Sequence, residues 1–123
     1  MTESLIAAAL GIMLFSSVIV APVVFSVLPA QWAGVYVRAF FPAYYATLGV
    51  VTGAAALLSH HEQTRLLCAT CALCFVFLLC VLTPMINKAR DSVEPRNFNL
   101  YHRMSVVINL LQILILTVCL FKY

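Results

Sequence analysis

Four runs of apolar residues, each long enough to cross a lipid bilayer, take up most of this 123-residue chain. A membrane-spanning helix needs about 20 apolar residues, and we expect spans at about residues 5–28, 31–58, 64–87 and 100–121. Hydrophobic residues make up 64% of the sequence and charged residues 9%, whereas soluble domains are about half apolar and about a quarter charged. The sequence therefore excludes an ordinary soluble enzyme. It predicts a single all-α domain over residues 1–123, an antiparallel four-helix transmembrane bundle.

Basic residues near the span ends predict the orientation of this bundle. With four spans, the first and third connections lie on one side, and that side carries Arg38, Lys88, Arg90, Arg96 and Arg103. The other side carries two basic residues, Arg65 and Lys122. Because cytoplasmic loops are enriched in Lys and Arg, we expect the first and third connections in the cytoplasm and both termini outside, in a bacterial inner membrane. A net charge of +3 spread over span ends sets topology and does not indicate a nucleic-acid partner.

Polar side chains of the fourth span recur on one helical face. His102, Ser105, Asn109 and Gln112 follow one another at steps of three, four and three residues, which places them on one side of a helix. Polar groups within a bilayer face protein or water rather than lipid. One interpretation is that they form hydrogen bonds that hold helices together, which we favour for Asn109 and Gln112. The other is that they line a site, and near His102 the two interpretations are equally supported.

The second span carries a matching face. Arg38, Pro42, Tyr45, Gly49 and Gly53 recur at steps of four, three, four and four residues. The two glycines form a G-x-x-x-G pattern, which allows two helices to approach closely. We therefore expect both glycines to serve helix packing and the Arg38 face to turn inward. The alternative for Arg38 is an interfacial residue that only sets topology.

Three prolines within the spans predict helix kinks: Pro22, Pro42 and Pro84. Proline has no N–H and leaves the carbonyl four residues earlier without its helical partner. Such a carbonyl must find another partner inside lipid. We expect the kink at Pro42 to aim Tyr45 at the polar face of the fourth span.

Residues that bind soft metals give weak candidates for a cofactor site. His102 together with Met85 or Met104 is a hypothetical copper or haem ligand set, but ordinary packing of the methionines is favoured. Three cysteines have the spacing of a metal motif, yet they fall on one apolar helix, where cysteine packs as a small apolar residue: Cys68, Cys71 and Cys74. We predict no cofactor. The sequence contains no recognisable catalytic motif, so we expect a protein that is not an enzyme.

Several motifs together resemble one known family. The segment Arg38-Ala39-Phe40-Phe41-Pro42-Ala43-Tyr44 contains an F-P-x-Y pattern, and Thr83-Pro84-Met85-Ile86-Asn87 precedes a helix carrying His102, Ser105 and Asn109. In this order they resemble the transmembrane-protein-205-like family, a four-span domain of unknown function. The resemblance covers nearly the whole chain and implies a four-helix integral membrane domain without an established activity. Tyr101 departs from the family pattern, where an aliphatic residue is expected before the histidine.

From these observations we expect an integral membrane protein of unknown molecular activity that binds a small polar or anionic ligand, or a lipid head group, at its cytoplasmic end. The expected pocket residues are Arg38, Tyr44, Tyr45, His102, Ser105 and Asn109. Arg38 would attract the anion. Its partners within the protein would be hydroxyls, amides, carbonyls freed by proline, or Asp91 and Glu94 of the third connection. His102 would act as a titratable donor or acceptor. The alternatives are a metal- or haem-handling protein and an accessory subunit of a larger membrane complex. Besides the lipid bilayer, the expected partners are further copies of the chain or such a complex.

Overall fold

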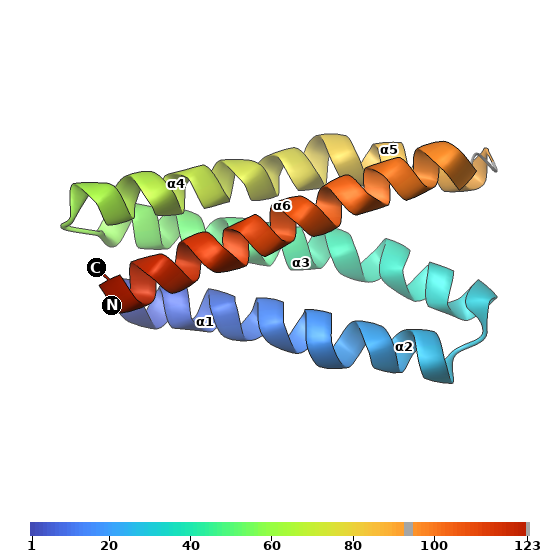
Figure 1. The fold of residues 1–123 in the computed structure, drawn as a ribbon, viewed down its shortest axis with the longest axis horizontal. Coiled ribbons are helices and arrows are strands. Elements are labelled where there is room, and N and C mark those ends of the chain that lie inside the picture. The colour runs from blue at the N-terminus through green and yellow to red at the C-terminus, as the bar shows by residue number, and fades with distance from the viewer. Residues whose placement is uncertain (93–94, 123) are drawn as a thin grey trace.

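The structure, a computed structural model, describes residues 1–92 and 95–122, and within this part of the chain every element is a helix. The elements are α1 (Thr2–Phe15), the π turn η1 (Ser16–Val20), α2 (Ala21–Val27), α3 (Ala30–Leu58), α4 (Glu62–Phe77), the π turn η2 (Leu78–Leu82), α5 (Thr83–Asp91) and α6 (Pro95–Lys122). Figure 1 shows them as four long rods lying side by side, with both termini at one end.

Four of the continuous helical stretches are long and apolar enough to cross a membrane: Thr2–Val27, Ala30–Leu58, Glu62–Asp91 and Asn99–Lys122. The first span packs through α1 against the second and fourth, and the third also packs against the second and fourth, so the four spans form a ring. Consecutive spans run in opposite directions (Figure 1). The predicted fold class, an all-α antiparallel four-helix bundle, is confirmed.

The third and fourth spans are longer than predicted. The expected spans left residues 88–99 as a polar connection, but α5 continues to Asp91 and α6 already begins at Pro95. Proline is tolerated in the first turn of a helix, where its missing N–H costs no hydrogen bond. Polar composition therefore marks where this helical pair leaves the apolar region, and not where the helices end. Glu94, one predicted partner of Arg38, lies outside the described residues.

A π turn precedes two of the three span prolines. The N–H of Ala21, next to Pro22, donates to the carbonyl of Ser16, and the N–H of Thr83, next to Pro84, donates to that of Leu78. Since proline cannot donate the next helical bond, the helix widens locally to bonds spanning five residues. The helix disturbances predicted at Pro22 and Pro84 therefore take the form of π turns. α3 stays α-helical through Pro42, and a kink there stays a prediction.

The well-packed core lies in the half of the bundle that holds the termini. Its fully buried side chains include Ile6 and Met13 of α1, Leu48 of α3, Phe75 of α4 and Leu116 of α6. The opposite half, where α2 ends and α6 begins, carries fewer buried side chains. We call that half the basic end, because five basic residues of the described chain belong to it: Arg38, Lys88, Arg90, Arg96 and Arg103.

The two glycines predicted to pack against a neighbouring helix differ. A Cβ on Gly49 would lie 3.6 Å from the Cβ of Phe75, so Gly49 sits where α3 meets α4. A Cβ on Gly53 would have no described atom of another element within 4 Å, so its predicted packing role is wrong. The reason is rotation of the helix face, because Thr52 and Ala56 take the buried positions of that turn.

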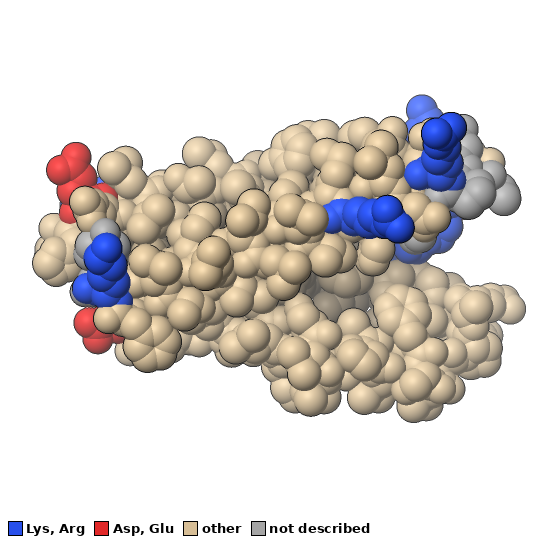
Figure 2. Space-filling view, in the orientation of Figure 1, with Lys and Arg blue, Asp and Glu red and all other residues tan. Residues whose placement is uncertain are grey.

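Apolar side chains cover the long sides of the bundle, as the bilayer requires. Val50, Leu57, Leu73 and Leu114 are all largely exposed. Figure 2 shows most charged residues at the two ends, one basic side chain set back from the right-hand end, and an uncharged surface over the rest of this face. Soluble proteins rarely expose such large apolar surfaces. In this chain every one of the four spans exposes large apolar side chains. The chain is an integral membrane protein.

Candidate functional site

The basic end encloses a cavity of about 680 Å³. Sites that hold small molecules usually measure about 300 to 1,000 Å³, so this volume suits a ligand far larger than water. Helices of all four spans contribute polar side chains to its wall. Ser16 and Ser17 come from η1, and Tyr44 and Tyr45 come from α3. The cavity exists because the side chains of the spans do not fill the basic half as they fill the other half.

Five of the six predicted pocket residues line this cavity: Tyr44, Tyr45, His102, Ser105 and Asn109. They come from α3 and α6, separated by more than fifty positions in the sequence. Periodicity placed Tyr45 and the α6 residues on inward faces, whereas Tyr44 was not part of the predicted α3 face. The polar face of α6 thus turns inward as predicted, with Asn109 and His102 both on the cavity wall. Asn109 also accepts a hydrogen bond from Tyr44 of α3, as the helix-holding interpretation predicts. Arg38 is the one member of the predicted set that does not line the cavity.

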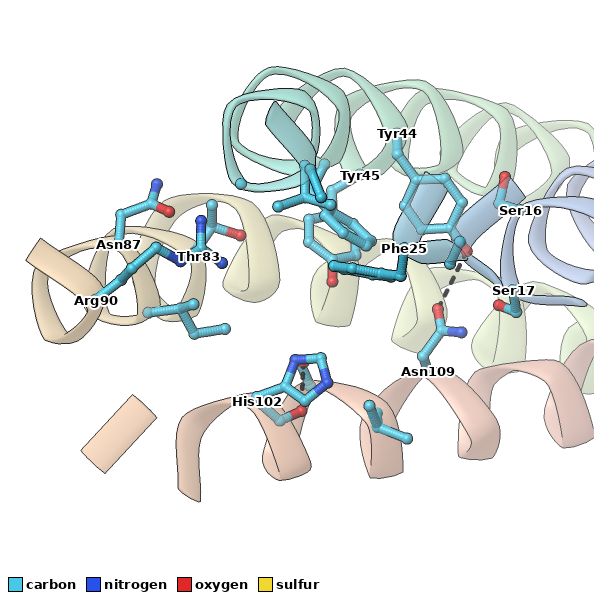
Figure 3. A pocket seen from close by; sticks show the side chains of 18 of the residues that line it. Ser16, Ser17, Phe25, Tyr44, Tyr45, Thr83, Asn87, Arg90, His102 and Asn109 are labelled. Atoms are coloured by element: carbon cyan, nitrogen blue, oxygen red, sulfur yellow. Dashed lines mark hydrogen bonds between the residues drawn. The ribbon is translucent and has the colours of Figure 1, made fainter. Parts of the chain in front are cut away.

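Tyr44 and Asn109 form the polar contact across the deep part of the cavity. The Tyr44 hydroxyl donates to Oδ1 of Asn109 over 3.3 Å, and Figure 3 shows Ser16 and Ser17 beside this pair. Tyr44 is held in place by ring contacts with Phe40, Phe41 and Tyr45, with centroids 5.3 to 5.8 Å apart. These ring contacts hold the Tyr44 hydroxyl in a fixed position on the cavity wall.

His102 occupies the cavity wall nearer the basic end. Its imidazole points into the space between α5 and α6 (Figure 3). The hydroxyl of Ser105 donates to the His102 carbonyl over 2.7 Å, so that hydroxyl is engaged with its own helix. The imidazole of His102 is therefore the group of this turn that is placed to meet a ligand.

α5 supplies the part of the site that the sequence prediction missed. Thr83, Asn87 and Arg90 recur at steps of four and three residues and all line the cavity. This polar face was visible as a pattern, but the segment after Asn87 was interpreted as a connection, so Arg90 was not placed on a helix. The guanidinium on the cavity wall is therefore that of Arg90, where the prediction had Arg38.

Arg38 points out of the cavity, which corrects the prediction for this residue. Its Nη2 donates to Oδ1 of Asp91 over 2.6 Å, and the two side chains are 43% and 63% exposed. The inward face of α3 runs through Val37 and Phe41, and the adjacent position on a helix is turned away by about 100°. Asp91 was one of several partners left open for Arg38, and the structure pairs the two side chains.

Arg38→Gln is expected to leave both ligand binding and folding nearly unchanged. An ion pair this exposed contributes less than about 1 kcal/mol, since water and salt screen it. We expect the free energy of unfolding, measured by circular dichroism during detergent-induced unfolding, to change by less than that amount. A loss of ligand binding as large as that of an Arg90 variant would contradict the outward placement of Arg38.

Gln112, the deepest member of the α6 face, joins helices instead of lining the cavity. It is 1% exposed, and its Nε2 donates to the carbonyl of Cys71 on α4 over 3.0 Å. This is the helix-holding interpretation of the polar face. The face therefore divides by depth, with a site towards the basic end and a structural hydrogen bond towards the core.

The hypothetical soft-metal set does not assemble. His102 lines the cavity, whereas Met85 and Met104 do not, and both methionines are exposed on the outer surface. Within the described chain, no three His, Cys, Asp or Glu side chains form a group suited to a metal ion. Cys68 and Cys71 are buried in the core, as the packing interpretation of the cysteines predicts.

The charge lining the cavity is cationic. Arg90 contributes a guanidinium, and the described lining residues include neither Asp nor Glu. A guanidinium binds carboxylates and phosphates through paired N–H groups, and its attraction is stronger beside an apolar wall than in water. The arrangement therefore favours an anionic group at the basic end of the cavity, with hydroxyl and amide groups available deeper inside.

Comparison with known proteins gives one match. The model of a family described as a domain of unknown function, DUF4149, matches residues 4–95. No curated protein and no solved structure matches the chain. The matched segment includes η1, α3 and α5, so it contains the cavity walls of the first three spans.

Proposed function

We propose that this chain, which belongs to the DUF4149 family of domains of unknown function, is a binding protein of the membrane that holds an anionic group in the cavity at its basic end. Arg90 supplies the charge that attracts the anion. Asn87 lies beside Arg90 on α5 and His102 lies on α6 (Figure 3), and both add hydrogen bonds. Tyr44 and Asn109 orient the deeper part of the ligand.

One observation carries this proposal, namely the placement of Arg90 on a cavity wall that is otherwise neutral. Charged side chains within a membrane domain are costly and tend to face protein interiors or functional pathways. The polar side chain that holds helices together in the core is Gln112, which donates to a backbone carbonyl. Arg90 lies instead on the cavity wall. The described lining residues offer a guanidinium, an imidazole, hydroxyls and amides but no carboxylate, so no acidic side chain on the wall repels a bound anion.

The orientation in the membrane is part of the proposal. The five basic residues of the basic end support its placement in the cytoplasm, with both termini and the α3–α4 turn outside. The ligand would then reach Arg90 from the cytoplasmic leaflet. A bacterial inner membrane as the location, the transmembrane-protein-205-like family as a closer assignment, and assembly into an oligomer or larger complex stay predictions.

Arg90→Gln tests the proposed function. Purification in a mild detergent, followed by mass spectrometry of what remains bound, is expected to find an anionic compound on the unaltered chain. A hydrogen bond to a charged group contributes about 1.5 to 3 kcal/mol, so we expect at least about tenfold less of it on the variant.

Arg103→Gln is the matched control, since Arg103 also belongs to the basic end but lies outside the cavity wall. Retention by this variant should equal that of the unaltered chain. Equal retention by the Arg90 variant, or equal losses in both variants, would remove the basis for an anion site at Arg90.

A further inference from the structure

We propose that the ligand is an anionic amphiphile taken from the bilayer, with its acidic head group beside Arg90 and its hydrocarbon chain leaving sideways between α2 and α6. This inference rests on the proposed function, because it needs an anion at Arg90. It adds the chemical class of the molecule and the route by which it enters.

The first observation is that the bundle opens on one side. Within the described residues, α1 packs against α6, whereas α2 packs against α3 and has no Cα atom within 8 Å of one in α5 or α6. The first span therefore separates from the fourth beyond the π turn at Ser16–Val20. Figure 2 shows the result as a hollow on the long side of the molecule, near the basic end.

The second observation concerns the walls of this opening. Ala21 and Phe25 of α2 and Val106 and Leu110 of α6 all line the cavity, and the side chains of Phe25 and Leu110 are 61% and 59% exposed. These residues thus reach from the cavity to the outer surface, and all four are apolar. Such walls suit a hydrocarbon chain and offer a polar solute no hydrogen bond.

The third observation is depth. The fourth span begins at Asn99, so Val106 and Leu110 lie about 10 and about 16 Å along it at about 1.5 Å per residue. The hydrocarbon region of a bilayer is about 30 Å thick. The opening therefore faces acyl chains, and a molecule that enters through it comes from the membrane.

The fourth observation is where the charge lies relative to the opening. Arg90 and Asn87 lie towards the basic end, which is the membrane-surface end of the cavity, Phe25 of the opening lies further along it, and the Tyr44–Asn109 pair lies deepest (Figure 3). An amphiphile whose head group stays near the membrane surface and whose chain leaves through the opening matches this order. A free inorganic anion would satisfy the head-group position and leave the apolar opening without a role.

Binding of added ligands to the full-length chain in mild detergent tests the inference. The probes are dodecyl phosphate, a neutral dodecyl alcohol and inorganic phosphate, each titrated and followed by native mass spectrometry. We expect dodecyl phosphate to bind one molecule per chain, at least tenfold more tightly than either of the other two probes. Arg90→Gln should weaken binding of dodecyl phosphate at least tenfold.

Leu110→Trp tests the sideways route, because the larger ring fills the opening. Leu114→Trp is the matched control, since Leu114 lies one turn further along α6, is 60% exposed and does not line the cavity. We expect the first variant to bind dodecyl phosphate at least tenfold more weakly and the second to bind normally. Val106→Phe, which fills the opening with a smaller ring, should also weaken binding.

The outcomes separate this inference from the proposed function. Two outcomes would keep the anion site but contradict the amphiphile. In the first, inorganic phosphate binds as tightly as dodecyl phosphate. In the second, Leu110→Trp and Val106→Phe both bind dodecyl phosphate normally while Arg90→Gln does not. If dodecyl alcohol binds as tightly as dodecyl phosphate, or no probe binds, the head-group site fails and the inference fails with it.

Discussion

Phe75→Ala is expected to lower the free energy of unfolding by about 3 to 5 kcal/mol, the usual cost of deleting a buried aromatic ring. Phe75 is fully buried, contacts the face of α3 at Gly49 and lies with its ring centroid 6.4 Å from that of Tyr45. Removing the ring leaves a void whose lining loses its dispersion contacts. Since helices in lipid associate largely through such packing, α3 and α4 should loosen together.

The same substitution should also weaken ligand binding. The ring of Tyr45 packs against that of Phe75 and also contacts the ring of Tyr44, so both tyrosines should lose their fixed positions. Reversible unfolding in mixed detergent micelles, followed by circular dichroism, measures the stability. Phe77→Ala is the control, since Phe77 is 42% exposed on the outer surface, and it should cost less than about 1 kcal/mol. A cost for Phe75→Ala no larger than that of Phe77→Ala would contradict the described core.

Gly49→Leu is expected to lower the free energy of unfolding by about 1 to 3 kcal/mol, the typical cost of overpacking a closed contact. The first carbon of a new side chain would already lie at van der Waals distance from the Cβ of Phe75, 3.6 Å away. The remaining carbons of leucine would have to push α4 aside. Alanine, which ends at that first carbon, should fit without this cost.

Gly53→Leu should instead raise the free energy of unfolding. No described atom of another element lies within 4 Å of a Cβ at this position, and replacing glycine inside a helix with a good helix former stabilises it by up to about 1 kcal/mol. The two leucine variants are compared in the same detergent unfolding assay. If both destabilise the chain equally, the helix contact at Gly49 is misplaced.

Much of the fold followed from the sequence because the bilayer allows few solutions. An apolar run long enough to cross the membrane must be helical, since its backbone groups have no other partners there. The spacing of His102, Ser105 and Asn109 then fixed which side of α6 faces the cavity. This spacing is reliable because a lipid-facing position for these polar side chains would be costly.

The cation of the site was assigned to the wrong helix for a physical reason. Arg38 follows Val37, which lines the cavity, and a shift of one position turns a helical side chain by about 100°. The G-x-x-x-G pattern favoured the face with Arg38, yet one of its glycines, Gly53, packs on no other described element. Arg90 was missed because charged residues after Asn87 were interpreted as the end of a helix.

The open side of the bundle was not predictable from hydropathy. Pro22 marks a disturbance in the first span, but the direction in which α2 leaves α6 depends on how the π turn at Ser16–Val20 rotates the following helix. Phe25 and Leu110 have the same sequence character as residues that simply face lipid. Their role in lining the cavity is a property of the packed spans.

A density map of the chain in a lipid nanodisc tests the central claim most directly. We predict that α2 stands apart from α6 near Phe25 and Leu110, and that elongated density fills the gap and reaches the guanidinium of Arg90. A map in which α2 packs against α6, with their own side chains filling the space and Arg90 directed outwards, would contradict it.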